Sequence, residues 1–101
     1  MSELGAQLEI LAIANGWQLS GELDAHTATA LTQAMSVLPD GEVTVDLAGV
    51  SFVDSSGLRV LLEATNRARN AGGELVLAHP QASIRRLIEI SGLRDHIRVQ
   101  E

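Results

Sequence analysis

Two serines and an aspartate stand together in the segment Val53-Asp54-Ser55-Ser56-Gly57-Leu58. The β-branched run Val43 to Leu47 before them predicts a buried strand, and apolar residues at helical spacing predict a helix over 56–70. The serines therefore fall between a strand end and a helix start, where α/β sheets place their working groups. A helix N-terminus has unpaired backbone N–H groups and partial positive charge, so a phosphorylated Ser55 or Ser56 would find hydrogen-bond donors there.

The same residues have a purely structural interpretation. Ser and Asp are favoured N-caps in helices of every kind, so Asp54 and Ser55 could simply begin the helix. Residue type and spacing leave both interpretations open.

Other reactive combinations are weaker. Three aspartates could form a carboxylate cluster that binds Mg²⁺ or transfers protons: Asp24, Asp46 and Asp54. Caps or loop anchors are simpler roles for two of them, and Asp46 fits a solvated acid at a strand end. The three histidines lie in separate segments without ligand spacing: His26, His79 and His96. Because cysteine is also absent, we expect no metal site, no cofactor and no catalytic residue.

Short strands and helices must position this segment. The dipeptide Asn15-Gly16 predicts a hairpin turn between two strands, and Asp24 predicts the N-cap of a first helix that reaches Leu38. Pro80 and Gly92 bound a last helix. Strands are expected over 8–14, 17–20, 43–47, 75–78 and 97–99, with a loop over 48–55.

The alternation of strands and helices indicates parallel pairing with right-handed crossovers. The fold class predicted is therefore α/β, as a single domain over residues 1–101. Its sheet should be mixed, mostly parallel and four- to five-stranded, with an N-terminal antiparallel hairpin and packed helices.

Composition limits the partners. The formal net charge is −6, which argues against nucleic acid, because phosphate binding needs a basic surface. Residues 1–54 hold eight acids and no base, and all seven cations are arginines between Arg59 and Arg98. No apolar run is long enough to cross a membrane, and Met1 to Gln7 lacks the pattern of a signal peptide. We expect a cytoplasmic protein.

Three blocks resemble the STAS domain family in the order that the family has them. They are Leu19-Ser20-Gly21-Glu22-Leu23-Asp24-Ala25-His26-Thr27-Ala28, the run from Val45 to Leu58, and Ile90-Ser91-Gly92-Leu93. The resemblance is to the anti-sigma-factor antagonists, in which the second serine of the Asp-Ser-Ser-Gly element is phosphorylated. It implies phosphorylation of Ser56 and a partner-binding surface made of Asp24, Asp54, Ser55, Ser56 and Gly57. Arg59 stands where the family commonly has a small residue.

The resemblance also implies a mechanism of partner switching. The unphosphorylated domain binds an anti-sigma factor, which is a serine kinase of the histidine-kinase-like ATPase fold, and so releases a sigma factor. Phosphorylation of Ser56 separates the pair, and a serine phosphatase resets the switch, so the domain itself is not an enzyme.

The main alternative is a constitutive STAS accessory subunit that binds an ABC-transporter ATPase in lipid transport. Such subunits lack a phosphorylatable serine at the position of Ser56. A sulfate-transporter-like cytosolic domain is a third possibility, which the absence of a membrane segment disfavours.

Overall fold

Strands and helices alternate after an initial hairpin in the computed structural model, which describes residues 8–101. The segment Met1 to Gln7, where we expect no signal peptide, lies outside the described residues. The strands are β1 (Leu8–Ile13), β2 (Gly16–Leu23), β3 (Glu42–Val53), β4 (Glu74–Ala78) and β5 (Arg98–Gln100). The helices are α1 (Ala28–Ala34), α2 (Ser55–Asn70) and α3 (Ala82–Ile90).

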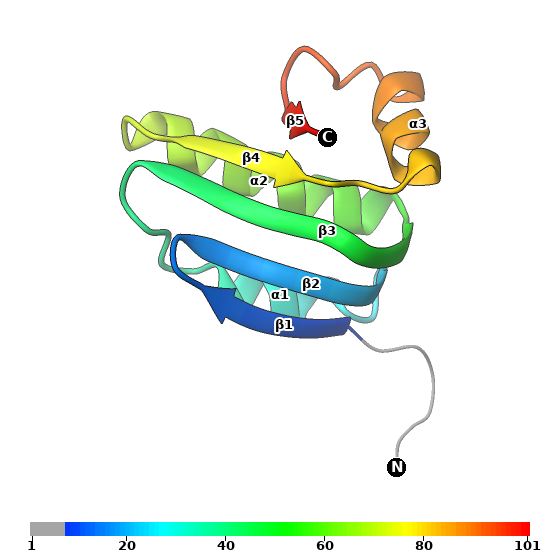
Figure 1. Ribbon diagram of the computed structural model, residues 1–101, viewed down its shortest axis with the longest axis horizontal. Helices are drawn as coiled ribbons and strands as arrows, with labels where there is room; N and C mark the ends of the chain where they lie inside the picture. Colours follow the sequence, from blue (N-terminus) through cyan, green and yellow to red (C-terminus); the bar gives the residue numbers. More distant parts are fainter. Residues whose placement is uncertain (1–7) are drawn as a thin grey trace.

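The five strands form one sheet whose spatial order, β1-β2-β3-β4-β5, is also their order in the chain (Figure 1). The hairpin partners β1 and β2 are antiparallel, and every later pair is parallel. This confirms the α/β fold and the mixed, mostly parallel sheet. Because β2, β3 and β4 run in the same direction, their carboxyl ends meet at one edge of the sheet.

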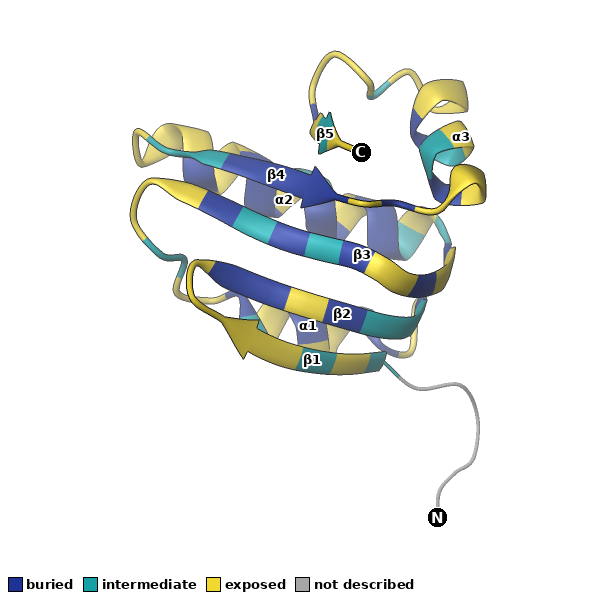
Figure 2. Ribbon diagram, in the orientation of Figure 1, coloured by how far each residue is buried: buried dark blue, intermediate teal, exposed yellow. Residues whose placement is uncertain are grey.

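The core is almost entirely aliphatic. Along β3, Val43, Val45 and Leu47 are fully buried, and the intervening Thr44 and Asp46 are half-buried, which is the alternation visible in Figure 2. The helices α1 and α2 lie behind the sheet in Figure 1, and α2 packs against β3 and β4. One connected cluster of apolar side chains joins the sheet to the helices.

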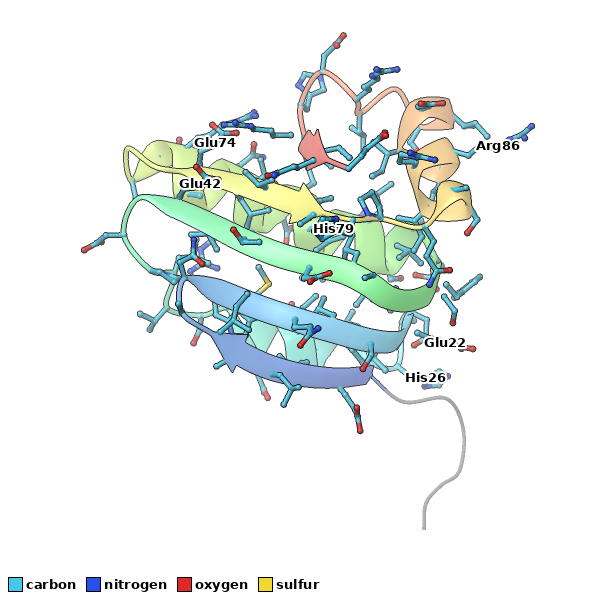
Figure 3. The ribbon with its side chains drawn as sticks, viewed as in Figure 1. Glu22, His26, Glu42, Glu74, His79 and Arg86 are labelled. Carbon is cyan, nitrogen blue, oxygen red and sulfur yellow. The ribbon has the colours of Figure 1, made fainter. Side chains whose placement is uncertain are left out.

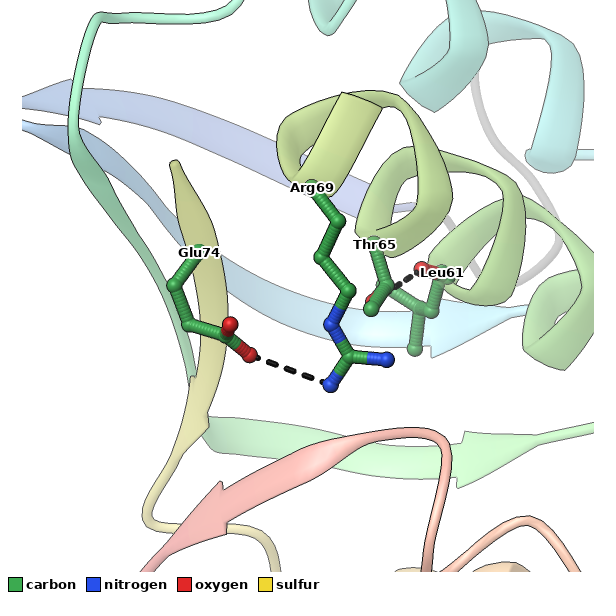
Figure 4. Close-up of polar contacts among 4 residues, drawn as sticks. All are labelled: Leu61, Thr65, Arg69 and Glu74. Atoms are coloured by element: carbon green, nitrogen blue, oxygen red, sulfur yellow. Dashed lines mark hydrogen bonds and ion pairs between the residues drawn. The ribbon is translucent and has the colours of Figure 1, made fainter. Parts of the chain in front are cut away.

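Polar contacts fix the carboxyl-terminal half of α2. The hydroxyl of Thr65 is fully buried and donates a hydrogen bond to the carbonyl of Leu61 at 2.9 Å, while Arg69 pairs with Glu74 at the start of β4 at 3.1 Å (Figure 4). The guanidinium of Arg67 donates to the carbonyl oxygens of Met35 and Ser36, just after α1. These contacts tie α2 to β4 and to the end of α1.

Several element boundaries differ from those predicted, and two differ most clearly. The loop expected over 48–55 is wrong for its first six residues, because β3 continues to Val53. Against β2, β3 shows register shifts, between Gln18 and Ser20 and between Gly21 and Glu22, that insert extra residues without ending the pairing. The first helix ends at Ala34 rather than Leu38.

Candidate functional site

The predicted site lies where β2 and β3 end side by side. Leu23 and Val53, the last residues of these strands, are paired in parallel register, and the amide of Asp54 donates to the carbonyl of Leu23 at 3.1 Å. The chain then turns directly into α2. The loop that follows β2 and the first turn of α2 therefore share one edge of the sheet.

Gly57 makes this close approach possible. It is buried in the first turn of α2, and a Cβ atom there would lie 2.5 Å from the Cγ of Leu23 and 2.6 Å from its carbonyl oxygen. Any side chain at position 57 would push α2 away from β2. Gly57 was predicted as part of the partner-binding surface. It is buried against Leu23, and it supports that surface by letting α2 lie close to the end of β2.

Asp54 is the N-cap of α2, as its residue type predicted. Its backbone is extended, its side-chain Oδ1 accepts from the amide of Gly57 at 3.0 Å, and its carbonyl accepts from the amide of Leu58. The carboxylate is half-buried. Ser55 is the first helical residue, one position earlier than the helix start predicted at 56.

The two serines open onto a shallow depression of about 370 Å³. Ser55 is exposed and Ser56 is half-buried, and within residues 8–101 neither hydroxyl makes a hydrogen bond. The depression is lined by Ala25, Ala28, Ser55, Ser56, Arg59 and Val60. An incoming group can therefore reach either serine from solvent.

A buried threonine fixes the loop that contains Asp24. The Thr27 side chain is 7% exposed, and its hydroxyl donates to the carbonyl of Glu22 at 2.9 Å and accepts from the amide of Asp24 at 3.0 Å. The carboxylate of Asp24 accepts from the amides of His26 and Thr27. Asp24 therefore closes the turn before α1, which starts later than predicted, at Ala28. Figure 3 shows Glu22 and His26 near this end of the sheet.

Sequence reasoning gave no role to Thr27 and did not place Arg59 in the depression. Asp24 and Thr27 lie three residues apart before an apolar run. This spacing is a capping signal, and it could have identified Thr27. Arg59 follows Ser56 by three residues, and residues three apart share a helix face, so helical spacing could have placed Arg59 beside the serines.

The remaining candidates lie elsewhere. Asp46 sits within β3, opposite Gln18 and Ala78, and its carboxylate accepts from the amide of Ala48 at 2.9 Å. Across residues 8–101 no three His, Asp or Glu side chains gather as a metal site would require. In the same part of the chain, no helix has the length and apolarity needed to cross a membrane.

Comparisons with known proteins agree with this geometry. The family profile described as "Mlab, STAS domain" matches residues 9–100. An anti-sigma-B factor antagonist of Listeria monocytogenes is 38% identical over 85 residues, which cover 81% of this chain and 75% of that protein.

Two solved structures share the fold. The anti-sigma factor antagonist SpoIIAA in its unphosphorylated form is similar over 96% of this chain and 89% of its own, with a TM-score of 0.71 and 22% identity. The Bacillus cell fate determinant SpoIIAA in the phosphorylated form is similar over 96% of this chain and 92% of its own, with a TM-score of 0.65 and 22% identity.

Proposed function

Because the chain belongs to the STAS domain family, we propose that it is an anti-sigma-factor antagonist switched by phosphorylation of Ser56. The observation that carries the proposal is the Ser56 hydroxyl, which makes no hydrogen bond within residues 8–101 and opens onto a depression at the first turn of α2. The curated relative at 38% identity is named for the same activity. The domain acts as a binding module in the cytoplasm and catalyses nothing.

The unphosphorylated domain binds an anti-sigma factor through the edge at which β2 and β3 end. Ser55 and Ser56 present their hydroxyls there, while Asp24 and Asp54 add half-buried carboxylates. Gly57 contributes by letting α2 lie against Leu23. Occupation of this surface by the anti-sigma factor releases a sigma factor from the same partner.

The partner is a serine kinase of the histidine-kinase-like ATPase fold. It transfers the γ-phosphoryl group of ATP to the Oγ of Ser56. The bond between the γ-phosphorus and the β–γ bridging oxygen breaks, ADP leaves, and the hydroxyl proton is lost as the new ester forms. The product carries about −1.5 to −2 extra charge at neutral pH. In the free domain the N-terminus of α2 favours that charge by roughly 0.3–1 kcal/mol, whereas a partner packed on Ser56 must strip the phosphate of water. The complex therefore separates, and a serine phosphatase restores it.

Phosphate labelling tests the assignment of the modified residue. With the cognate kinase and ATP, the wild type should gain one phosphate and Ser56→Ala none, as read by intact mass spectrometry. Ser55→Ala is the matched control, because it removes the neighbouring exposed hydroxyl and leaves Ser56 in place. It should gain one phosphate, as the wild type does. Labelling lost in Ser55→Ala and retained in Ser56→Ala would move the switch to Ser55.

A second candidate is a constitutive accessory subunit that binds an ABC-transporter ATPase. The matching profile is described as "Mlab, STAS domain" and does not name sigma-factor regulation, so it is compatible with this second function. Affinity purification from native extract with ATP present separates the two functions. Recovery of a histidine-kinase-like ATPase, identified by mass spectrometry, supports the switch, and recovery of an ABC ATPase supports the accessory subunit.

A further inference from the structure

Arg59 lies beside the two serines on the same face of α2. It follows Ser56 by three residues, a spacing that brings side chains together on a helix surface. Arg59 and both serines line the same depression of about 370 Å³. Arg59 is exposed and is the first cation in the sequence, since residues 1–58 contain no lysine or arginine.

The carboxylates around this depression do not neutralise Arg59. In the described part of the chain, the carboxylates of Asp24 and Asp54 accept hydrogen bonds from backbone amides, and neither forms an ion pair with it. By contrast, Arg69, Arg85 and Arg94 each pair with a glutamate: Glu74, Glu101 and Glu89. The guanidinium of Arg59 is therefore available to an anion that arrives in the depression.

One acid on α2 competes for this guanidinium. Glu63 follows Arg59 by four residues and is exposed, but no ion pair joins them in the described residues. An arginine that precedes a glutamate by four is the weaker orientation of such a pair. A doubly charged phosphate three residues before Arg59 should outcompete the single charge of Glu63.

We propose that Arg59 is the counter-ion of phosphorylated Ser56, pairing its guanidinium with the phosphate oxygens across one turn of α2. The proposal rests on the phosphorylation of Ser56 put forward above and specifies how the free domain accommodates it. The planar guanidinium donates two parallel hydrogen bonds to phosphate oxygens. This pairing offsets the repulsion from Asp24 and Asp54 and stabilises the phosphorylated domain in its free state.

Titration of the phosphate itself tests the pairing without any kinase. Phosphoserine is installed at position 56 by amber suppression in the full chain, in the wild type and in Arg59→Gln, and its ³¹P chemical shift is followed between pH 4 and 8. A nearby cation favours the dianion, so Arg59→Gln should raise the second pKa of the phosphate by about half a unit. Arg59→Lys keeps the charge and should restore most of the wild-type value.

Two controls test whether the change in the phosphate pKa is specific to Arg59. Arg69→Gln removes the same charge from the same helix about 20 Å from Ser56, more than two Debye lengths at physiological salt, and should leave the phosphate pKa unchanged. Each variant is also measured with His26→Gln, which removes the imidazole two residues after Asp24 from the neighbourhood of the site.

The outcomes separate this inference from the proposed function. A phosphate pKa that is equal in the wild type and Arg59→Gln, or raised equally by Arg59→Gln and Arg69→Gln, would overturn the role of Arg59. The installed phosphate does not depend on a kinase, so a failure of kinase labelling at Ser56 would count against the switch and leave the titration result standing. Circular dichroism of each variant confirms that the exposed substitutions leave the fold intact.

Discussion

At the scale of single residues, the site combines side chains that are fixed by hydrogen bonds with side chains that make none in the described residues. The carboxylates of Asp24 and Asp54 accept hydrogen bonds from backbone amides, and the hydroxyl of Thr27 donates to the carbonyl of Glu22 and accepts from the amide of Asp24. The hydroxyls of Ser55 and Ser56 make no such bonds within residues 8–101. The bonded residues define the shape of the surface, and within residues 8–101 the two serine hydroxyls of this site have no hydrogen-bond partner.

Asp54 should stabilise the fold through its side-chain Oδ1, which caps the first turn of α2. Asp54→Ala removes the oxygen that accepts from Gly57 and should lower the free energy of unfolding by about 1 kcal/mol. Asp54→Asn keeps an equivalent oxygen and is also a good N-cap, so its loss should be much smaller. Urea denaturation of both variants measures the difference, and equal losses would show that the charge of Asp54, rather than its capping bond, stabilises α2.

Thr27 should stabilise the loop through its hydroxyl. Thr27→Val keeps the shape of the side chain but leaves the part-buried carbonyl of Glu22 and the amide of Asp24 without their partner. We expect a loss of about 1–3 kcal/mol in the free energy of unfolding, together with faster amide exchange at residues 24–27. Thr27→Ser restores the hydroxyl and is the control, and a Val variant as stable as the wild type would refute this role.

At the scale of elements, the position of α2 depends on its contact with the end of β2. Gly57→Ala places a methyl group 2.6 Å from the carbonyl of Leu23, which is backbone and cannot rotate away. We expect a loss of about 1–3 kcal/mol in the free energy of unfolding, because α2 must shift outward. Ser55→Ala, an exposed change in the same turn, should cost far less by the same measurement, and similar losses would show that the contact is easily relaxed.

The strands and helices that alternate regularly could be predicted from the sequence, and so could the position of Ser56 in the first turn of a helix. The second half of β3 could not. Its buried residues Leu47, Val50 and Val53 are three apart, because the register shifts against β2 add residues between them. A spacing of three departs from the period of two of a regular strand, so the alternation that predicted the strand did not extend it past Leu47.

The end of α1 was also beyond prediction, for a different reason. The carbonyls of Met35 and Ser36 accept from Arg67, which is more than thirty residues further along the chain. Local sequence patterns carry no information about such a distant partner. The bonds of the Thr27 hydroxyl, by contrast, reach only Glu22 and Asp24, so the local spacing of Asp24 and Thr27 could have indicated them.

At the scale of the molecule, charge is divided between two halves. Because strand order follows chain order, residues 1–54 with eight acids and no base include the half of the sheet from β1 to β3. The later residues carry seven arginines against five acids, so the halves hold −8 and +2 of the net −6. Asp24 and Asp54 belong to the acidic half, so a partner that docks at this edge should present a basic surface.

Association with the partner should therefore slow as salt is added. We expect the association rate to fall severalfold between low and physiological ionic strength, as measured by surface plasmon resonance. Glu22→Gln, near the site in Figure 3, should slow association at low salt. Glu42→Gln, at the opposite end of the sheet in the same view, removes an equal charge and should have a smaller effect. Equal effects would mean that only net charge matters.

The strand order has a consequence for how the chain reaches its structure. Every strand pairs with the strand next to it in sequence, so the sheet can be extended strand by strand in chain order. Each parallel pairing spans a crossover helix, so the β1–β2 hairpin is the most local pairing and the one expected to form earliest. On the ribosome, the chain through residue 59 contains the hairpin, β3, the loop of Asp24 and the turn that carries Ser56 and Arg59. The segment proposed as the switch is therefore synthesised before β4, α3 and β5, which complete the far side of the sheet.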